Sequence, residues 1–205
     1  MRCRFATPCS HAAPPRSVKL SLATCTAIIA QLAFSPATHA DDLQPWTAST
    51  TPALALSTLD GADAALAAYR GNVVIVHFFA TWCEPCLTEL ENLDHLRSDL
   101  KDAPLCILAV DVGEPKVRTQ RYFESFPVRF PILLDLDKTA MKAWAVDALP
   151  TSYVLGADLS PLWKGDGVVD WNAPATRSRL NAAIAAIKAP ATLPADTPQP
   201  PGETK

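Results

Sequence analysis

Short apolar runs alternate with amphipathic runs through the middle of the chain. Some runs are apolar on both faces and rich in β-branched residues, which is typical of strands buried in a parallel sheet. These predicted strands cover residues 73–79, 104–112, 131–135 and 151–155. Other runs carry apolar residues at helical spacing, and these predicted helices cover residues 85–100, 114–126, 138–146 and 172–188. Strands that alternate with helices predict an α/β fold with a central, mostly parallel sheet.

The flanking segments have weaker patterns. Residues 53–58 alternate like an edge strand, residues 64–69 suit a short helix, and residues 161–169 suit an antiparallel return strand. Residues 41–52 are mostly polar and contain Pro45, so we expect a linker there. Residues 189–205 hold five prolines and almost no large apolar residue, which predicts a disordered tail. The predicted domain therefore covers residues 53–188.

The first 40 residues have the composition of an export signal. They contain basic residues and no acidic ones, followed by an uncharged apolar run over residues 20–34 and a small-residue exit at Thr38 and Ala40. This order is typical of a secretory signal peptide, which we expect to be cleaved. The 15-residue run is shorter than the roughly 20 residues of a spanning helix. Retention of residues 20–34 as an inner-membrane anchor is the alternative.

Loss of this segment changes the charge and the cysteine count. The chain carries 18 basic and 21 acidic side chains, and the first 40 residues hold four of the basic ones, so the remainder has a formal charge of −7. Such a charge disfavours nucleic acid as a partner, because binding to nucleic acid depends on neutralising phosphates. Three cysteines remain, namely Cys83, Cys86 and Cys106, which are too few for a scaffold dense in disulfides.

Cys83 and Cys86 lie three residues apart, directly after an apolar strand pattern and at the start of an amphipathic helix pattern. Unpaired N–H groups and the helix dipole stabilise a thiolate at that position. The second cysteine, one turn later, is near enough to close a small disulfide. A zinc site needs about four ligands and no second ligand cluster is present, while a three-residue staple constrains very little of the unfolded chain. The position therefore favours a redox pair.

Two motifs carry a family resemblance. The stretches "FFATWCEPC" at residues 78–86 and "ALPTSYVL" at residues 148–155 resemble the thioredoxin superfamily, and "AVDVGEP" with "FPILLD" extends the likeness to the exported TlpA/ResA group of thiol-disulfide oxidoreductases. The resemblance covers about residues 53–188. It implies a thioredoxin-like fold whose mixed, mostly parallel sheet is flanked by helices, with an extra helix and strand near residues 114–135.

The resemblance also implies roles for residues around the pair. Cys83 would be the exposed nucleophile, and Cys86 would resolve the mixed disulfide. Pro150 matches the family's cis-proline, whose neighbouring backbone, at Leu149, would align a substrate strand. A platform beside the thiols is implied for Trp82, although packing alone would also explain a tryptophan there. Tuning of the reduction potential is implied for two residues between the cysteines, Glu84 and Pro85.

Two further residues are candidates for proton transfer. Glu89 is three residues after Cys86, on roughly the same helix face, and a glutamate at that spacing works with the active site in the ResA branch. An ordinary exposed helix glutamate is the alternative. His77 stands where thioredoxins carry a buried aspartate, which departs from the family pattern. It is either a proton relay or a histidine satisfied within the sheet.

We therefore expect a periplasmic enzyme that reduces disulfides in exported proteins, for example in cytochrome c or oxidase assembly. Its expected partners are those proteins and a membrane thiol donor. The Cys83–Cys86 disulfide is the expected redox group, with no metal or other cofactor, and the chain is expected to act as a monomer. "CEPC" lacks the histidine that strong oxidases carry between their cysteines, which favours reduction. The alternatives are a thiol peroxidase of the same fold and a non-catalytic copper chaperone.

Overall fold

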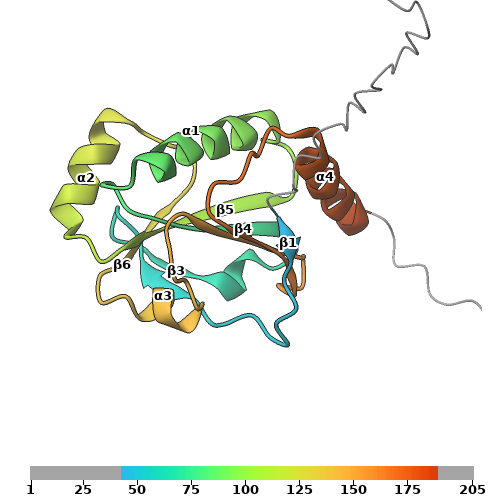
Figure 1. Ribbon diagram of the computed structural model, residues 1–205, viewed down its shortest axis with the longest axis horizontal. Coiled ribbons are helices and arrows are strands. Elements are labelled where there is room, and N and C mark those ends of the chain that lie inside the picture. Colours follow the sequence, from blue (N-terminus) through green and yellow to red (C-terminus); the bar gives the residue numbers. More distant parts are fainter. Residues whose placement is uncertain (1–42, 189–205) are drawn as a thin grey trace, which may run out of the picture. The chain divides into compact units, whose positions relative to one another are not determined.

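The computed structural model describes residues 43–188, and a six-stranded mixed sheet forms its centre (Figure 1). The strands run in the order β1-β8-β7-β4-β5-β6. Their bounds are β1 Gln44–Pro45, β4 Val73–Phe79, β5 Leu105–Val112, β6 Ile132–Asp135, β7 Thr151–Leu155 and β8 Pro161–Asp166. β4, β5 and β6 are parallel, while β7, β8 and β1 extend the sheet by antiparallel pairing. The α/β class and the mixed sheet expected from the sequence are confirmed.

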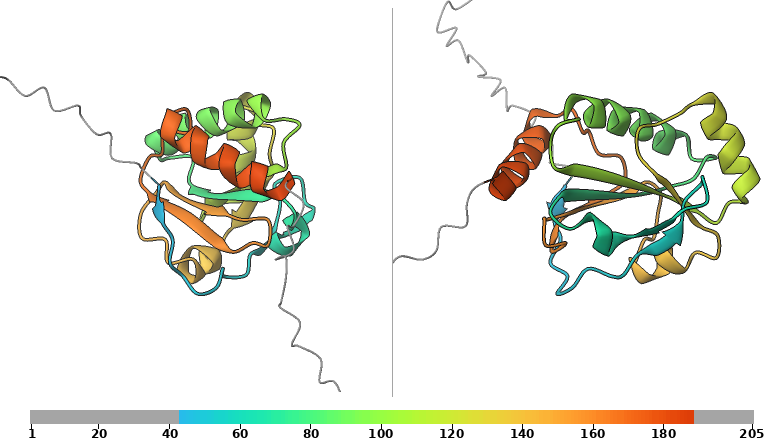
Figure 2. Two further views of the ribbon diagram at one scale, coloured as in Figure 1. Left: turned by 90° about the vertical axis from the view of Figure 1, so that its right-hand side faces the viewer. Right: turned by 180° about the vertical axis from the view of Figure 1, so that it is seen from behind.

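Helices cover both faces of this sheet (Figure 2). One face packs against three helices, namely α1 Glu84–Asp99, α2 Lys116–Ser125 and α4 Pro174–Lys188. The other face packs against α3 Thr139–Ala143, the 3-10 helix η1 Leu66–Tyr69, and the hairpin of β2 Ala55–Ser57 with β3 Asp63–Ala65. The helix–strand insertion expected near residues 114–135 is α2 followed by β6, the edge strand beside β5.

β4 shows why the central strand pattern is continuously apolar. Val73 and Ile75 pack into the core beneath α1, whereas Val74 and Val76 pack into the core beneath α3. All seven residues of the strand are buried. Since full burial of such a side chain contributes about 1.5–3 kcal/mol, β4 fixes both layers to the sheet. The end of this strand is therefore a rigid support for the residues that follow it.

The structure differs from the sequence-based expectation near the start of the domain. Residues 41–52, expected to be a linker, contain β1, which pairs with β8 at Gln44 and Pro45. Trp46 follows and stacks on Trp144 with ring centroids 5.8 Å apart. A two-residue strand has no hydrophobic period to detect, so the pattern could not reveal it. The helix expected over residues 64–69 is likewise shorter, because the segment begins in β3 and only then forms η1.

Three expected segments lie outside the described residues. They are the signal peptide of residues 1–40, the apolar run of residues 20–34 within it, and the tail of residues 189–205. Within residues 43–188, no helix has both the length and the hydropathy needed to cross a membrane. The expectations for the flanking segments therefore remain predictions.

Candidate active site

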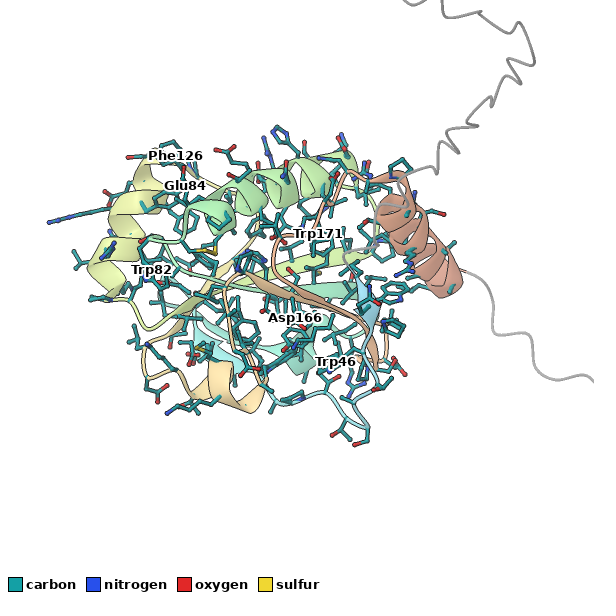
Figure 3. All side chains as sticks on the ribbon, viewed as in Figure 1. Trp46, Trp82, Glu84, Phe126, Asp166 and Trp171 are labelled. Carbon is teal, nitrogen blue, oxygen red and sulfur yellow. A yellow bond between two sulfur atoms is a disulfide. The ribbon has the colours of Figure 1, made fainter. Side chains whose placement is uncertain are left out.

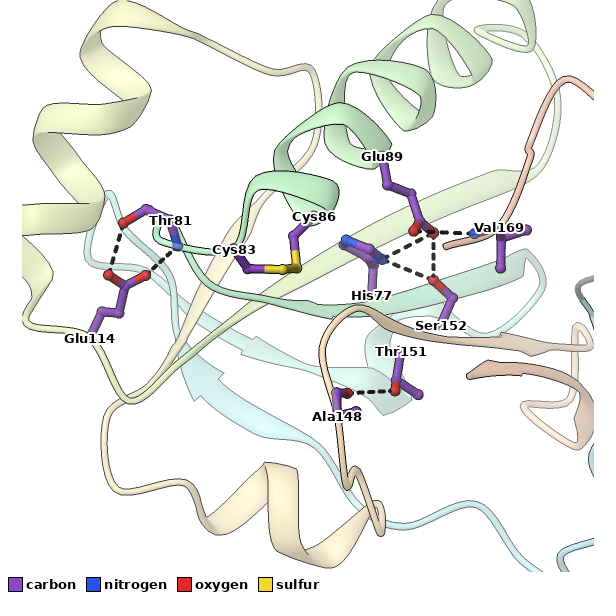
Figure 4. Close-up of a disulfide and its surroundings, with 10 residues drawn as sticks. All are labelled: His77, Thr81, Cys83, Cys86, Glu89, Glu114, Ala148, Thr151, Ser152 and Val169. Atoms are coloured by element: carbon purple, nitrogen blue, oxygen red, sulfur yellow. Dashed lines mark hydrogen bonds and ion pairs between the residues drawn. A yellow bond between two sulfur atoms is a disulfide. The ribbon is translucent and has the colours of Figure 1, made fainter. Parts of the chain in front are cut away.

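Cys83 and Cys86 form a disulfide where the chain passes from β4 into α1 (Figure 4). Cys83 is the N-cap residue of α1, and Pro85 lies in the first turn, where a missing N–H costs little. Cys83 keeps 7% of its surface exposed and Cys86 keeps none. Of the two cysteines only Cys83 therefore reaches the surface, although it is more covered than the exposed nucleophile implied by the resemblance.

The helix start also sets the electrostatics of the pair. The first N–H groups of an α-helix have no partner within the helix, and the macrodipole places partial positive charge there. A thiolate formed at Cys83 on reduction would sit against this end of α1, which lowers the pKa of such thiols. The Cys86 sulfur instead lies inside the core beneath α1, among apolar side chains. The two sulfurs therefore differ in both access and solvation.

The residues implied in substrate binding and in tuning of the reduction potential differ in burial. Trp82, labelled in Figure 3, is 63% exposed, so it is not a core tryptophan, and its role as a platform beside the thiols stays a prediction. Glu84 and Pro85 are exposed in the first turn of α1. The Leu149–Pro150 peptide bond is cis, as the resemblance implied. Leu149 is half-buried against both cores, and Pro150 is buried.

Beneath Cys86 lies a buried polar network that joins α1, β4 and β7 (Figure 4). His77 Nδ1 is 2.9 Å from Ser152 Oγ, its cross-strand neighbour on β7. Ser152 Oγ donates to Glu89 Oε1 at 3.1 Å, and the His77 Nδ1 to Glu89 Oε1 distance is 3.6 Å. All three side chains are fully buried. The structure thus brings His77 and Glu89, which the sequence offered as separate candidates, into one network, and their roles in proton transfer stay predictions.

Glu89 is not the exposed helix glutamate of the alternative interpretation. It accepts hydrogen bonds from the indole N–H of Trp171 at 2.8 Å and from the backbone N–H of Val169 at 3.3 Å, as well as from Ser152. Trp171 is fully buried and is labelled in Figure 3. A buried carboxylate that receives several donors is stabilised by charge-assisted hydrogen bonds. The segment between β8 and α4 thus helps to build this site.

His77 is held in its neutral form. Burial lowers the pKa of His77 to about 3, because the imidazolium loses its hydration in the core. Its ring lies parallel to that of Phe79, with centroids 6.2 Å apart. Its Nε2 has no hydrogen-bond partner among the residues that the structure describes. A buried polar atom without a partner costs free energy, which makes His77 Nε2 a candidate for a role in the chemistry of the site.

A second polar cluster lies on the other side of the disulfide, behind the turn that precedes Cys83. The Glu114 carboxylate accepts hydrogen bonds from both the backbone N–H and the hydroxyl of Thr81. Arg118 Nε lies 2.9 Å from Glu114 Oε1 and 3.3 Å from Thr81 Oγ1. Glu114 is buried, whereas the Arg118 side chain is 57% exposed. This cluster ties the active-site turn to the start of α2.

Asp111, at the end of β5, is a further buried carboxyl near that turn. Thr119 donates a hydrogen bond to Oδ2, and within the described part of the chain no donor reaches Oδ1, although the Glu114 carboxylate lies close enough to interact with Asp111. Burial raises the pKa of Asp111 to about 7, and Glu114 also raises it. Asp111 pairs in register with Phe79 of β4. It therefore titrates close to neutral pH on the same side of the sheet as His77.

Sequence reasoning missed several members of these clusters. Ser152 carried a signal, because it is a small polar residue inside "TSYVL", the run of a predicted buried strand. Trp171 and Val169 carried none, since the contact of a loop with a helix 80 residues earlier has no local pattern. Glu114 lies within the "AVDVGEP" stretch but shows no periodicity that would place it at the turn. In residues 43–188, no group of three or more His, Cys, Asp or Glu side chains could hold a metal ion.

Solved structures with this arrangement of elements are known. A secreted thiol-disulfide isomerase from Corynebacterium glutamicum matches with a TM-score of 0.61 and 17% identity, over 74% of this chain and 95% of the other. A thiol:disulfide interchange protein of the thioredoxin family from Chlorobium tepidum matches with a TM-score of 0.56 and 21% identity, over 69% of this chain and 97% of the other. Such likenesses establish the thioredoxin-like fold.

Sequence comparison gives a narrower result. The thiol-disulfide oxidoreductase ResA of Geobacillus thermodenitrificans is 37% identical over 107 residues, and ResA of Bacillus subtilis is 32% identical over 110 residues. These stretches are 52% and 54% of this chain and 62% of each relative, so the match spans about three-fifths of the relatives' length. The family model described as "AhpC/TSA family" matches residues 47–159, more than half of the chain. The chain therefore belongs to the AhpC/TSA family.

Proposed function

We propose that this protein is an exported thiol-disulfide oxidoreductase that reduces disulfides in other proteins. The observation that carries the proposal is the Cys83–Cys86 disulfide at the start of α1, in which only Cys83 reaches the surface. The similarity to the ResA proteins, which are named thiol-disulfide oxidoreductases, supports the same chemistry. The Cys83–Cys86 pair is itself the redox group of the proposal.

The reaction takes two exchange steps from the dithiol form. The Cys83 thiolate attacks one sulfur of the partner's disulfide, forms a mixed disulfide and releases the partner's other sulfur as a thiolate. Cys86 then loses its proton and attacks Cys83 Sγ, which re-forms the internal disulfide and releases the second partner thiolate. Two electrons pass to the partner in total. A membrane thiol donor restores the dithiol, since an oxidising compartment does not do so unaided.

Exposed apolar side chains favour a protein as the substrate. Among the described residues, the large hydrophobic side chains that are exposed are Trp82, Val117, Phe126, Leu136 and Val168. Trp82, Val117 and Leu136 follow the ends of the parallel strands β4, β5 and β6, and therefore lie at one edge of the sheet. Val168 joins them, because the N–H of the preceding glycine donates to the carbonyl of Pro150. Apolar residues gathered at one edge are typical of a protein-binding surface.

The proposed compartment rests on the pattern of residues 1–40, and the proposed targets rest on the family resemblance. The basic and apolar composition of residues 1–40 supports export to the periplasm, with retention through residues 20–34 as the alternative. Disulfides of cytochrome c or oxidase assembly proteins are the proposed targets, on the resemblance to the TlpA/ResA group. The acidic charge of the remaining chain supports protein partners over nucleic acid.

The first experiment is the reduction potential of the Cys83–Cys86 couple, measured by equilibration with dithiothreitol or glutathione and thiol trapping. A reductase is expected to give a value near or below about −270 mV, as thioredoxin does. A value near about −120 mV would reverse the proposed direction. Absence of a reversible couple would refute the oxidoreductase proposal and leave only the fold.

The two alternatives receive less support. A thiol peroxidase would need a hydroxyl and an arginine directed at the reactive sulfur, and Thr81 and Arg118 do lie side by side. Both are, however, engaged by Glu114. A copper chaperone would use the two thiols as ligands, and residues 43–188 hold no group of three or more His, Cys, Asp or Glu side chains that would add to them. Peroxide turnover without reduction of insulin disulfides would favour the peroxidase, and tight, stoichiometric Cu(I) binding that depends on Cys83 and Cys86 would favour the chaperone.

A further inference from the structure

We propose that Ser152 holds His77 in the tautomer that presents an unprotonated Nε2 to Cys86, so that His77, Ser152 and Glu89 pass the proton of the Cys86 thiol to the Glu89 carboxylate. Ser152 is thereby a positioning residue for the second exchange step. The inference rests on the proposed function, since it concerns how the resolving sulfur becomes a thiolate. It adds a residue to which the sequence analysis assigned no role.

The hydrogen-bond directions fix the tautomer. The indole N–H of Trp171 and the backbone N–H of Val169 can only donate. Glu89 Oε1 accepts from the first and Glu89 Oε2 accepts from the second. Ser152 has one hydroxyl proton, which it donates to Glu89 Oε1. The contact between Ser152 Oγ and His77 Nδ1 must then use the proton of the imidazole. Neutral imidazole carries one N–H, so the lone pair is on Nε2.

The position of the ring gives this lone pair a target. His77 lies on the face of β4 that packs beneath α1, in the core that also contains Cys86. Figure 4 shows the ring between Cys86 and the Glu89 carboxylate, with the nitrogen that makes no drawn contact on the side of the disulfide. The same nitrogen is the buried atom without a hydrogen-bond partner among the described residues. Once the disulfide is reduced, the Cys86 thiol supplies the donor that Nε2 lacks.

The proton then moves without burying a new charge. The thiol proton passes to His77 Nε2, the Nδ1 proton passes to Ser152 Oγ, and the Ser152 hydroxyl proton passes to Glu89 Oε1. His77 ends neutral in its other tautomer, Ser152 ends as a hydroxyl, and one negative charge has moved from Glu89 to the Cys86 sulfur. Burial lowers the pKa of His77 to about 3, which disfavours an imidazolium but leaves this concerted exchange open. His77 alone would be a poor base, so the proton transfer requires the Ser152 hydroxyl that connects His77 with Glu89.

The titratable groups around His77 are few in the described structure. α1 presents Glu89 and Cys86, and β5 presents Asp111 two residues beyond the neighbour of His77. In the segment before α4, Asp170 is exposed. It accepts hydrogen bonds from the backbone N–H groups of Asn172 and Ala173. Because the pKa of Asp111 is raised to about 7 by burial, its titration overlaps the pH range of the test. The pH profiles are therefore compared in an Asp111→Asn background as well.

The kinetic test follows the second exchange step alone. The full chain, with serine at the four cysteines outside the pair, is reduced and mixed with 5,5′-dithiobis(2-nitrobenzoate) in a stopped-flow instrument. Cys83 releases the first thiolate of the reagent, and attack by Cys86 releases the second. The parent is expected to show a second phase that is nearly independent of pH from about 6 to 8, because the proton stays inside the protein. In Ser152→Ala this phase is expected to be roughly 10–100-fold slower at pH 6 and to rise with pH.

Two variants separate proton transfer from structure. Ser152→Thr keeps a hydroxyl and is expected to restore the pH-independent phase. Ser160→Ala removes a hydroxyl that also donates to a carboxylate, that of Asp158, but lies on the exposed turn between β7 and β8, and it is expected to match the parent. A pH-independent second phase in Ser152→Ala, or equal slowing at every pH, would overturn the proposal.

A second measurement needs no activity at all. ¹⁵N NMR of the oxidised parent, with the ring signals assigned by comparison with His77→Asn, is expected to show a protonated Nδ1 and an unprotonated Nε2. Ser152→Ala is expected to shift the ring toward the other tautomer. A protonated Nε2 in the parent would overturn the inference even if the couple is reversible. The expected tautomer in a protein with no reversible couple would instead support the network and refute the proposed function.

Discussion

Two buried glutamates flank the disulfide, and their surroundings differ. Glu89, beneath Cys86, is fully buried and accepts from a tryptophan, a serine and a backbone N–H that are themselves buried. Glu114, behind the turn before Cys83, is 4% exposed and is paired with Arg118, whose side chain is 57% exposed. A cation neutralises the Glu114 charge permanently, whereas neutral dipoles hold the Glu89 charge. The arrangement around Glu114 suits a fixed support. The arrangement around Glu89 suits a group that changes its charge during the reaction.

The titratable groups beside these two glutamates have pKa values that are shifted in opposite directions. Burial lowers the pKa of His77, near Glu89, to about 3, and raises the pKa of Asp111, near Glu114, to about 7. Both shifts favour the neutral form, because burial penalises charge. Acid pH therefore destabilises the side of the disulfide that contains His77, and neutral or alkaline pH destabilises the side that contains Asp111. The active-site turn lies between two clusters with opposite pH responses.

The largest expected effect is on stability, in Glu89→Gln. A glutamine amide accepts on one oxygen only, so at least one of the buried donors on Val169 or Trp171 loses its acceptor. Each buried unpaired group costs about 1–3 kcal/mol, and we expect the free energy of unfolding in urea to fall by about 3 kcal/mol. Glu114→Gln, beside an exposed arginine, is expected to lose about 1 kcal/mol. Equal losses in both variants would contradict the contrast between the two glutamates.

The next effect is on the pH dependence of the free energy of unfolding. The folded pKa of His77 is depressed, so its stabilisation is present above about pH 6.5 and is lost as pH falls toward 3. The folded pKa of Asp111 is raised, so its stabilisation is present below about pH 4 and is lost as pH rises through about 7. A single group changes stability by at most about 1.36 kcal/mol per pH unit.

Between pH 4 and 6.5 these two contributions oppose each other and partly cancel. Asp111→Asn is expected to make stability rise more steeply with pH in this range, and His77→Asn is expected to make it fall with pH. Urea unfolding at half-unit pH steps measures both slopes. Parallel pH profiles for the two variants would show that the clusters do not respond in opposite senses.

A smaller effect is expected in Glu114→Ala. The backbone N–H of Thr81 loses its acceptor in a half-buried position, so the cost in stability is about 1–2 kcal/mol. The turn before Cys83 is expected to open more often, which amide hydrogen exchange at Thr81 measures. The first phase of the dithiobis(nitrobenzoate) reaction reports attack by Cys83, and we expect the rate of this phase to change. The pH profile of the second phase is expected to stay as in the parent. A changed pH profile in the second phase would argue that Glu114 belongs to the proton path.

The sequence predicted the strands that carry the site and the place of the cysteines. Residues 73–79 are the clearest case, because a strand buried on both faces is continuously apolar and needs no tertiary information. β1 escaped prediction, since its two residues pair with β8 more than 100 residues later. The cis bond before Pro150 was available only from the family resemblance, because an X-Pro sequence alone favours trans.

The candidate site divides in the same way. Cys83, Cys86 and Glu89 share one helix, so their spacing alone places them near one another. Ser152, Val169 and Trp171 reach the site from other elements, and no local period connects them to Glu89. The burial of Glu89 was also beyond the sequence, because the chain segment that covers it lies between β8 and α4. Local chemistry was thus predictable, and the polar network that serves it was not.

The smallest effect on stability is expected for Trp82→Ala, which tests the exposed side of the comparison. Trp82 is 63% exposed, so its loss should change the free energy of unfolding by less than about 0.5 kcal/mol. Reduction of insulin is expected to slow roughly fivefold, about 1 kcal/mol, because an exposed aromatic side chain contributes contact area to a protein partner. Reduction of dithiobis(nitrobenzoate), which is too small to span the apolar surface, is expected to stay within about twofold, and Trp82→Phe is expected to recover most of the insulin rate. Equal slowing with both substrates would mean that Trp82 acts on the disulfide itself. The exposed side of the site, at Trp82, and the buried side, at Glu89, would then not divide protein binding from proton transfer.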